Sequence, residues 1–415
     1  MIVTKWTGVE VRALRTAALR VSQPEFADIL GFTVAAVRKW ETRRETIELS
    51  GRYAAAMDTV LDRLTDSERS RFEAALMPGP RPASMRTVAD SFENPADITR
   101  RVQGLTVLAS DGDVLDILTL AVDDVVHRYE FEGPRRLAPE VITARHQVEA
   151  MLGQRRHPAQ LRALYAVAGR LSGVLGYMAV NRGRFGHARM YCREAFAIGQ
   201  LLGDTDLQAW VKGTESFCAY YQGDYAAAVR AAYEGLNLAN GGPQSIRLYS
   251  NGLARALGKV GDSTGVAAAT TTAAALDTGP GLTPALTFAP YGEARIMANA
   301  ATAFLSAGAY QRCLEYGQQV EDRVAESDSV WSRSLVRLDM AAAMLGAGRR
   351  DVERAAHLGV EALDTSSDRP IRSVWQRAHE LGAIIGAIRS RASDEYLGSL
   401  REWSSTAREF SAPEG

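Results

Sequence analysis

Residues 22–41, SQPEFADILGFTVAAVRKWE, contain two short amphipathic segments separated by Leu30-Gly31. Ser22 is a good N-cap and Pro24 falls in the first turn, where its missing N–H costs nothing, so the pattern predicts a helix that begins here. Gly31 permits a tight turn, and Thr33 can cap a second helix. The two helices are expected to share one small core, with these apolar contributors: Phe26, Ala27, Ile29, Leu30, Val37 and Trp40.

Two short helices joined in this way are what a helix-turn-helix unit needs, in which the second helix enters the major groove of DNA. The spacing leaves Val34, Ala35, Arg38 and Lys39 on the outward face of that helix. Val34 and Ala35 can pack on thymine methyl groups, whereas Arg38 and Lys39 can reach polar base edges, with DNA shape supplying further selectivity. The alternative is a small helical bundle whose exposed face happens to be basic.

The same stretch resembles the Xre (lambda-repressor-like) family of DNA-binding domains, whose motif runs from a Ser-Gln start to a closing aromatic-Glu pair, here Trp40-Glu41. The resemblance covers roughly residues 8–76. It implies that Glu41 pairs with Arg12 or Arg15, although Arg15 lies one residue further from Gln23 than in the pattern of that family. It also implies DNA contacts from Gln23 and phosphate contacts from Arg43 and Arg44. The expected DNA-binding residues are Gln23, Thr33, Val34, Ala35, Arg38, Lys39, Arg43 and Arg44.

Charge is distributed unevenly along the chain. The 415 residues have a formal net charge of −1, which argues against a protein that coats nucleic acid indiscriminately but permits a local basic patch. Residues 1–44 carry eight Lys and Arg against four Asp and Glu. Basic residues are almost all Arg, and Ala is abundant, as in proteins of GC-rich bacterial genomes. A single Arg is therefore weak functional evidence in this chain.

The cellular compartment follows from the cysteines and the hydropathy. Cys192, Cys218 and Cys313 are isolated in apolar helical context, which favours buried thiols in a reducing cytoplasm over disulfides. The N-terminus lacks the pattern of a signal peptide, and the uncharged apolar run Leu381–Ile388 is too short to span a bilayer. We expect a cytoplasmic protein with no membrane association.

Proline placement predicts the domain organisation. Residues 50–76 favour two further helices that complete a first domain over residues 1–76. The segment MPGPRPAS, residues 77–84, has three prolines in five residues, so a linker is expected over residues 77–110. Residues 111–415 then read as helix after helix, with a capping hairpin at 113–160 and another at 371–410.

This long helical region is periodic. Five glycines precede the second helix of an expected hairpin at separations of 40, 38, 47 and 40 residues: Gly183, Gly223, Gly261, Gly308 and Gly348. Seven residues before each glycine the chain has a small residue, which lets two helices touch: Gly176, Ser216, Ala254, Ala301 and Ala341. The third hairpin is interrupted at residues 277–281. The alternative is a generic Ala-rich helical bundle with glycines at chance spacing.

With Phe185, Tyr225 and Tyr310 in the aromatic place after the glycine, the array resembles tetratricopeptide repeats. The expected fold class is all-α, a helix-turn-helix bundle followed by a tetratricopeptide-like right-handed α-solenoid. Such solenoids present the first helix of each hairpin along a concave groove. The residues expected to line it and bind a ligand are Tyr177, Asn181, Trp210, Phe217, Tyr221, Asn251, Arg255, Lys259 and Arg295. For each of them the alternative is an inter-repeat core position or a solvated charge.

No catalytic constellation, metal site or cofactor motif can be singled out, so neither an enzyme nor a cofactor is expected. The combination of an Xre-like domain with such an array resembles bacterial peptide-sensing and related signal-responsive regulators. That resemblance implies a homodimeric transcription factor that binds double-stranded DNA and responds to a peptide or small-molecule effector. The alternative is a protein-interaction scaffold whose N-terminal bundle docks a partner protein.

Overall fold

The computed structural model describes residues 5–43, 47–76, 94–95, 97–99, 101, 111–154, 157–276, 279, 281–325, 329–347, 351–407 and 410. The chain divides into two compact units, Met1–Phe92 and Glu93–Gly415. The boundary falls inside the segment expected to be a linker. Within that segment, positions 95, 97–99 and 101 are helical and Thr99 is buried, so part of it is structured.

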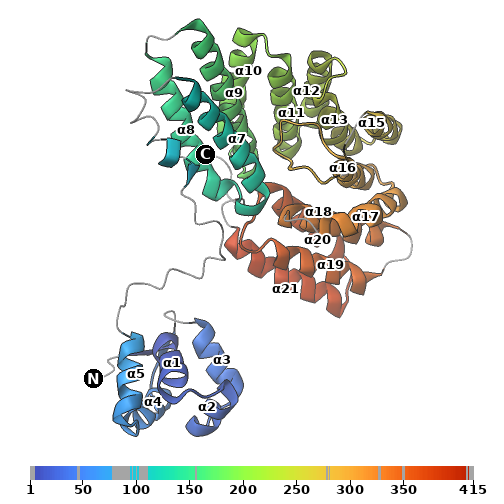
Figure 1. Cartoon of the computed structure of the whole chain (residues 1–415). Coiled ribbons are helices and arrows are strands. Elements are labelled where there is room, and N and C mark those ends of the chain that lie inside the picture. The colour runs from blue at the N-terminus through green and yellow to red at the C-terminus, as the bar shows by residue number, and fades with distance from the viewer. Residues whose placement is uncertain are drawn as a thin grey trace. The chain divides into compact units, whose positions relative to one another are not determined.

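The first unit, blue in Figure 1, is a helical bundle with one two-stranded antiparallel sheet that pairs Trp6 with Leu49. Its elements are β1 Trp6–Thr7, α1 Gly8–Ala13, the π-helical segment η1 Leu14–Leu19, α2 Gln23–Leu30, α3 Val34–Arg43, β2 Glu48–Leu49, α4 Arg52–Asp62 and α5 Asp66–Leu76. The two helices expected from residues 22–41 and the two expected from residues 50–76 are therefore present. The described residues contain no other strands, and the fold class is all-α.

Aromatic side chains form ring contacts in the core of this unit. Phe32, Trp40 and Tyr53 form a cluster with ring centroids 5.1–5.7 Å apart. Trp6 stacks on Phe72 and donates its indole N–H to Asp58 at 2.7 Å, which holds the first strand against α4 and α5. Ile29 was expected in this core, but 51% of it is exposed, because the two-turn helix α2 buries Phe26, Ala27 and Leu30 instead.

The second unit is built from helices that follow one another around a curved array (Figure 1). They are α7 Asp111–Glu132, α8 Pro134–Leu152, α9 Pro158–Asn181, α10 Phe185–Leu202, α11 Thr205–Gln222, α12 Tyr225–Ala239, α13 Gln244–Arg247, the π-helical segment η3 Leu248–Ala254, α14 Arg255–Lys259, α15 Ser263–Ala275, α16 Glu293–Ser306, α17 Tyr310–Ala325, α18 Val330–Gly346, α19 Val352–Thr365, α20 Arg372–Ile385 and α21 Arg391–Thr406.

The expected hairpins are present. α9 packs on α10, α11 on α12, η3 on α15, α16 on α17 and α18 on α19. Gly183, Gly223, Gly261 and Gly308 have positive φ between 68° and 83°, the left-handed conformation that ends one helix and redirects the chain into the next. Gly348 lies outside the described residues. The expected capping hairpins correspond to α7 with α8 and to α20 with α21.

The small residues lie at contacts between helices, as the spacing predicted. Ala254, Ala301 and Ala341 are fully buried between the helices of their hairpins, and the Ser216 hydroxyl donates to the carbonyl of Ala228 on the facing helix at 2.8 Å. A Cβ placed on Gly176 would lie 3.2 Å from the sulfur of Cys192. Close helix contact at these positions therefore requires a small side chain.

The array closes on itself, which the repeat pattern did not predict. α7 contacts α18, and α9 contacts α20, although these helices are far apart in sequence. In addition, the segment of residues 281–292 between α15 and α16 packs into the interior, with Leu286, Thr287 and Tyr291 buried. The expected open concave groove is therefore wrong for this chain, because residues 281–292 fill the interior.

One helix, α9, is long and apolar enough to cross a membrane by length and composition. Of its most apolar window, 72% is buried inside the unit, as in the core helix of a folded domain. Its apolar surface is thus used by α8, α10 and α11, which pack against it.

The packing at Gly176 gives a stability prediction. Gly176→Val should lower the free energy of unfolding by about 1–3 kcal/mol, because the added atoms must displace Cys192 and Tyr191. As the control, Gly186→Ala on α10 meets nothing within 4 Å and should raise stability by up to about 1 kcal/mol. Urea unfolding followed by circular dichroism measures both. Equal effects of the two substitutions would refute tight packing at this crossing.

Candidate functional site

Local capping interactions set the bounds of α2 and α3. The Ser22 hydroxyl accepts from the Glu25 backbone N–H, while the Glu25 carboxylate accepts from the Ser22 N–H at 2.8 Å, a complete capping box. Gly31 ends α2 in the left-handed conformation with φ 69°. The Thr33 hydroxyl then accepts from the Ala36 N–H at 3.2 Å, so the expected turn and both expected caps are confirmed.

Glu41 ties α3 to the preceding helices. Its carboxylate accepts two hydrogen bonds from Arg15, at 2.6 and 2.9 Å, and a third from the Gln23 side-chain amide at 2.8 Å. Of the two expected partners, Arg15 makes the ion pair, whereas Arg12 is exposed and acts only as a more distant charge. Burial acts to raise the pKa of Glu41, but the hydrogen bonds from Arg15 and Gln23 outweigh it and lower that pKa.

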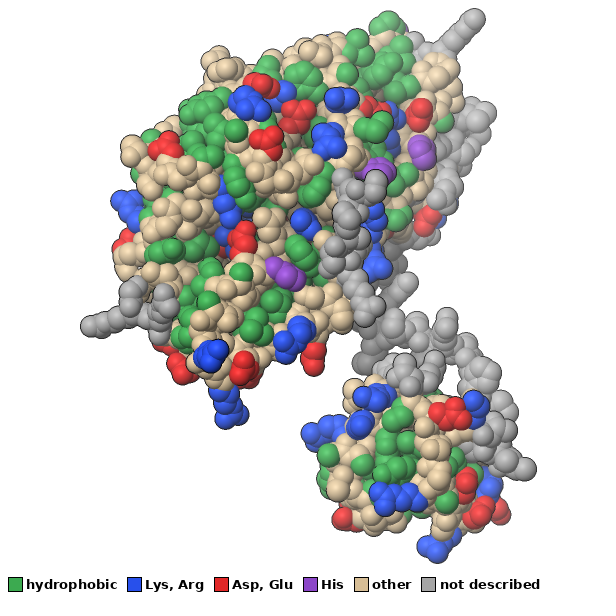
Figure 2. Space-filling model, turned by 180° about the vertical axis from the view of Figure 1, so that it is seen from behind, with side chains coloured by type: hydrophobic (Ala, Val, Ile, Leu, Met, Phe, Trp, Pro, Cys, Tyr) green, Lys and Arg blue, Asp and Glu red, His purple; other side chains and the backbone are tan. Residues whose placement is uncertain are grey.

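The residues expected to contact DNA differ in exposure. Thr33, Ala35, Arg38, Lys39 and Arg43 are exposed, and Arg44 lies outside the described residues. Val34 was expected to face outward, but it is half-buried and packs against the core of the unit. Gln23 is half-buried, with its amide engaged by Glu41. The exposed face of α3 is thus mainly Ala35, Arg38 and Lys39. Figure 2 shows Lys and Arg side chains scattered over the visible face of this unit, with Asp and Glu among them.

The Arg15–Glu41 pair gives a pH-dependent prediction. Because the folded-state pKa of Glu41 lies below its ordinary value of 4.5, its contribution is present above that value and is lost as the pH falls through the folded-state pKa. Glu41→Gln should therefore cost the first unit about 1–3 kcal/mol at pH 7 and progressively less below about pH 4.5.

Fluorotryptophan-labelled full-length chain provides the measurement, since the ¹⁹F signals of Trp6 and Trp40 report on this unit during urea unfolding. The matched control is Glu48→Gln. Glu48 pairs with Lys5, and both side chains are more than half exposed, so this substitution should lower the free energy of unfolding by at most about 1 kcal/mol. A pH-independent cost of Glu41→Gln would contradict the assignment of the pair.

In the second unit, the residues expected to line the groove converge on a partly open cavity. Its volume is about 60 Å³, measured as space open to the centre of a water molecule. Seven of the nine expected ligand-binding residues line it: Tyr177, Asn181, Phe217, Tyr221, Asn251, Arg255 and Arg295. The other two, Trp210 and Lys259, lie elsewhere. Sequence reasoning missed Tyr129, Glu130, Asn299 and Trp331, which also line the cavity.

Trp210 is covered by the segment of residues 281–292. Its indole N–H donates to the Thr287 carbonyl at 2.8 Å, and its ring stacks on Phe288 with centroids 4.6 Å apart. The side-chain amide of Gln244 donates to the Phe288 carbonyl at 2.6 Å. The segment therefore occupies part of the interior where an extended peptide would have to lie. Its apolar sequence LTPALTFAPY, residues 282–291, is the signal that could have predicted this role.

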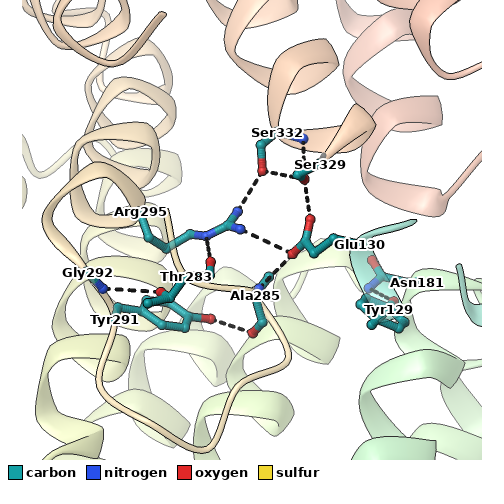
Figure 3. Close-up of polar contacts among 10 residues, drawn as sticks. All are labelled: Tyr129, Glu130, Asn181, Thr283, Ala285, Tyr291, Gly292, Arg295, Ser329 and Ser332. Carbon is teal, nitrogen blue, oxygen red and sulfur yellow. Dashed lines mark hydrogen bonds and ion pairs between the residues drawn. The ribbon is translucent and has the colours of Figure 1, made fainter. Parts of the chain in front are cut away.

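Glu130 near the end of α7 closes the array (Figure 3). One carboxylate oxygen accepts from the Ala285 backbone N–H at 2.7 Å and from Arg295 at 3.1 Å, and the other accepts from the Ser329 hydroxyl. Arg295 also donates to the Thr283 carbonyl and the Ser332 hydroxyl, each at 2.8 Å. One buried carboxylate thus holds the interior segment, α16 and the start of α18 to α7.

Aromatic residues surround this polar network. The Tyr129 hydroxyl accepts from the Asn181 amide at 2.7 Å, and its ring lies 5.3 Å from Trp331. The rings of Tyr177 and Phe217 are stacked at 5.0 Å. Burial raises the pKa of Tyr129 and of Tyr177, so both hydroxyls stay protonated at neutral pH. The cavity walls are therefore aromatic, with a few polar anchors, as is usual for ligand sites.

Lys259 belongs to a second buried charge network. Its ammonium group lies 3.0 Å from the Glu380 carboxylate, and Arg377 lies 3.0 Å from Asp339. Burial raises the pKa of Asp339 despite the nearby Arg377, whereas Arg377 and Lys259 overcome the burial of Glu380 and lower its pKa. Lys259 is thus already paired and does not line the cavity.

The described residues contain no group of three or more metal-ligating side chains. Cys192, Cys218 and Cys313 are free and buried, and burial raises the pKa of Cys192 and of Cys313. These thiols are therefore packing residues in the present geometry. No family model and no curated protein matches this chain. The functional argument accordingly rests on the geometry of the two units.

The closure by Glu130 gives a prediction about the second unit. Glu130→Gln should lower its stability by about 3 kcal/mol, because Arg295 would remain buried without a carboxylate. Glu130→Gln combined with Arg295→Gln should cost less than the sum of the two single substitutions. The matched control is Glu293→Gln, whose half-exposed pair with Arg323 should contribute at most about 1 kcal/mol. The ¹⁹F signals of Trp210 and Trp331 report the unfolding, and additive losses would contradict direct coupling.

Proposed function

We propose that this chain is a bacterial, cytoplasmic transcriptional regulator that binds specific double-stranded DNA through its first unit. The observation that carries the proposal is the arrangement of α2, the Gly31 turn and α3, with Arg38 and Lys39 exposed on α3. As a helix-turn-helix of the Xre kind, this unit would place α3 in the major groove. Arg38 and Lys39 would contact base edges or phosphates, and Ala35 would pack on thymine methyl groups.

Gln23 would serve chiefly as a positioning residue in this proposal. Its side-chain amide donates to the Glu41 carboxylate, which also accepts from Arg15. This carboxylate therefore joins the start of α2, at Gln23, to the end of α3, at Glu41. A fixed angle between the two helices is what lets a recognition helix enter the groove in one register. Thr33 and Arg43 are exposed at the two ends of α3 and would contact backbone phosphates.

The second unit would be the sensor and the dimerisation unit, a closed variant of a tetratricopeptide-like array. Support comes from the regular hairpins and from the cavity with aromatic walls. Ligand binding in this cavity would change the packing among α7, α16 and α18, which meet at Glu130. In a homodimer, that change would alter the spacing of the two DNA-binding units, and affinity depends on a match to one helical turn of DNA. No catalytic role is part of the proposal.

A protein-interaction scaffold is the second candidate. The observation that favours it is the exposure of Ile29 on α2, since an exposed apolar side chain beside a basic surface also suits a protein partner. This candidate predicts that Arg38 and Lys39 are irrelevant to nucleic acid.

The deciding experiment measures binding of the full-length chain to genomic fragments around its own gene at two salt concentrations. Arg38→Ala combined with Lys39→Ala should weaken selective binding at least about tenfold and reduce its salt dependence, because both base and phosphate contacts are lost. The charge-matched control combines Lys5→Ala with Arg63→Ala, two exposed residues outside α2 and α3, and should retain most of the affinity.

Footprinting on the selected fragment should show two protected half-sites about one helical turn apart, as a homodimer requires. Equal loss of affinity in the two double variants would remove α3 as the reading helix. Absence of selective binding in the unmodified chain would favour the scaffold.

A further inference from the structure

We infer that the cavity of the second unit binds a compact carboxylate, whose charge is held by Arg255. The inference names the chemical class of the effector and rests on the proposed function only for the effector's regulatory role. The starting point is the charge of the cavity wall. Among the residues that line it, the charged ones are Glu130, Arg255 and Arg295. Since Glu130 and Arg295 are paired, one positive charge is left over, on Arg255.

Arg255 is buried, and each of its hydrogen-bond partners is neutral. Its guanidinium donates to the Asn251 side-chain oxygen and to the Tyr221 hydroxyl, both at 2.6 Å, and it lies 4.6 Å from the centre of the Tyr220 ring. Its Nε donor has no partner within the described part of the chain. A buried charge is costly unless an opposite charge compensates it, and aromatic rings and neutral oxygens compensate only in part.

A second unsatisfied donor lines the same cavity. The side-chain Nδ2 of Asn299 is buried and has no hydrogen-bond partner among the described residues. A water molecule could satisfy such a donor, but water cannot neutralise a guanidinium. A carboxylate would supply both the negative charge and several acceptor positions, and Arg geometry suits that group.

The size of the cavity limits the ligand. The space open to the centre of a water molecule is about 60 Å³, so the cavity accepts a few waters or one compact organic acid. The stacked rings of Tyr177 and Phe217 offer an apolar wall for the body of such a molecule. An extended peptide is disfavoured, because residues 281–292 already fill the adjoining interior.

The test uses thermal unfolding of the full-length chain with benzoate, with the neutral isostere benzamide, and with inorganic phosphate, each at about 10 mM. A ligand that binds only the folded state raises the midpoint temperature. We expect benzoate to raise it by about 2 °C or more, and benzamide and phosphate to have smaller effects. Equal shifts with benzoate and benzamide would overturn the role of the charge, and a shift with phosphate alone would overturn the carboxylate.

Asn251→Asp provides the decisive variant, because it puts a carboxylate at an acceptor to which Arg255 already donates at 2.6 Å. It should raise the midpoint temperature without ligand and abolish the difference between benzoate and benzamide. The matched control, Asn237→Asp, changes an exposed residue of α12 and should leave that difference unchanged. If Asn251→Asp lowers the midpoint and retains the benzoate response, Arg255 does not hold the ligand.

The regulatory role is tested separately, by measuring DNA binding with and without benzoate. Benzoate stabilisation without selective DNA binding would leave the carboxylate site standing and refute the proposed function. Selective DNA binding without benzoate stabilisation would support the proposed function and refute the carboxylate site.

Discussion

The second unit depends on one buried carboxylate. Glu130 on α7 accepts hydrogen bonds from Ala285, Arg295 and Ser329, which come from an interior segment and from helices more than 150 positions later in the sequence. A carboxylate with this many donors is well compensated for its burial, whereas removal of a partner would leave an unpaired charge in a low-dielectric interior. This polar contact adds to the apolar packing that also joins α7 to α18, such as Tyr129 against Trp331.

Local signals allowed much of the fold to be predicted. A glycine in the left-handed conformation and a small residue seven positions earlier are properties of a few neighbouring residues, and Gly183 with Gly176 shows both. Closure could not be predicted in this way, because nothing near Glu130 in the sequence indicates Arg295 as its partner. The interruption at residues 277–281 was interpreted as a loop within a repeat, yet the apolar residues after it fill the interior.

At the candidate sites too, local sequence patterns predicted some features, whereas tertiary contacts decided others. Helical spacing correctly grouped seven residues that line the cavity, because they recur on the inner helix of successive hairpins, but it predicted an open groove. At the first unit, spacing misplaced Ile29 and Val34, each of which lies at the edge of an apolar stripe. In helices of only eight and ten residues, core contacts from neighbouring helices decide which edge residue is buried. Those contacts are tertiary and leave no periodic signal.

Each of the two π-helical segments contains a residue of one of the candidate sites. In the first unit, Arg15 lies in η1 and meets Gln23 of α2 at the carboxylate of Glu41. In the second unit, η3 contains Asn251 and ends next to Arg255, which carries the unbalanced charge of the cavity and donates a hydrogen bond to Asn251. A wide helical turn is less favourable than a regular α-helical one, so it persists where contacts with the surrounding structure stabilise it. At η1 those contacts are the three hydrogen bonds to Glu41, and at η3 they are the bonds of Arg255 to Asn251 and Tyr221, which makes both segments parts of the sites they adjoin.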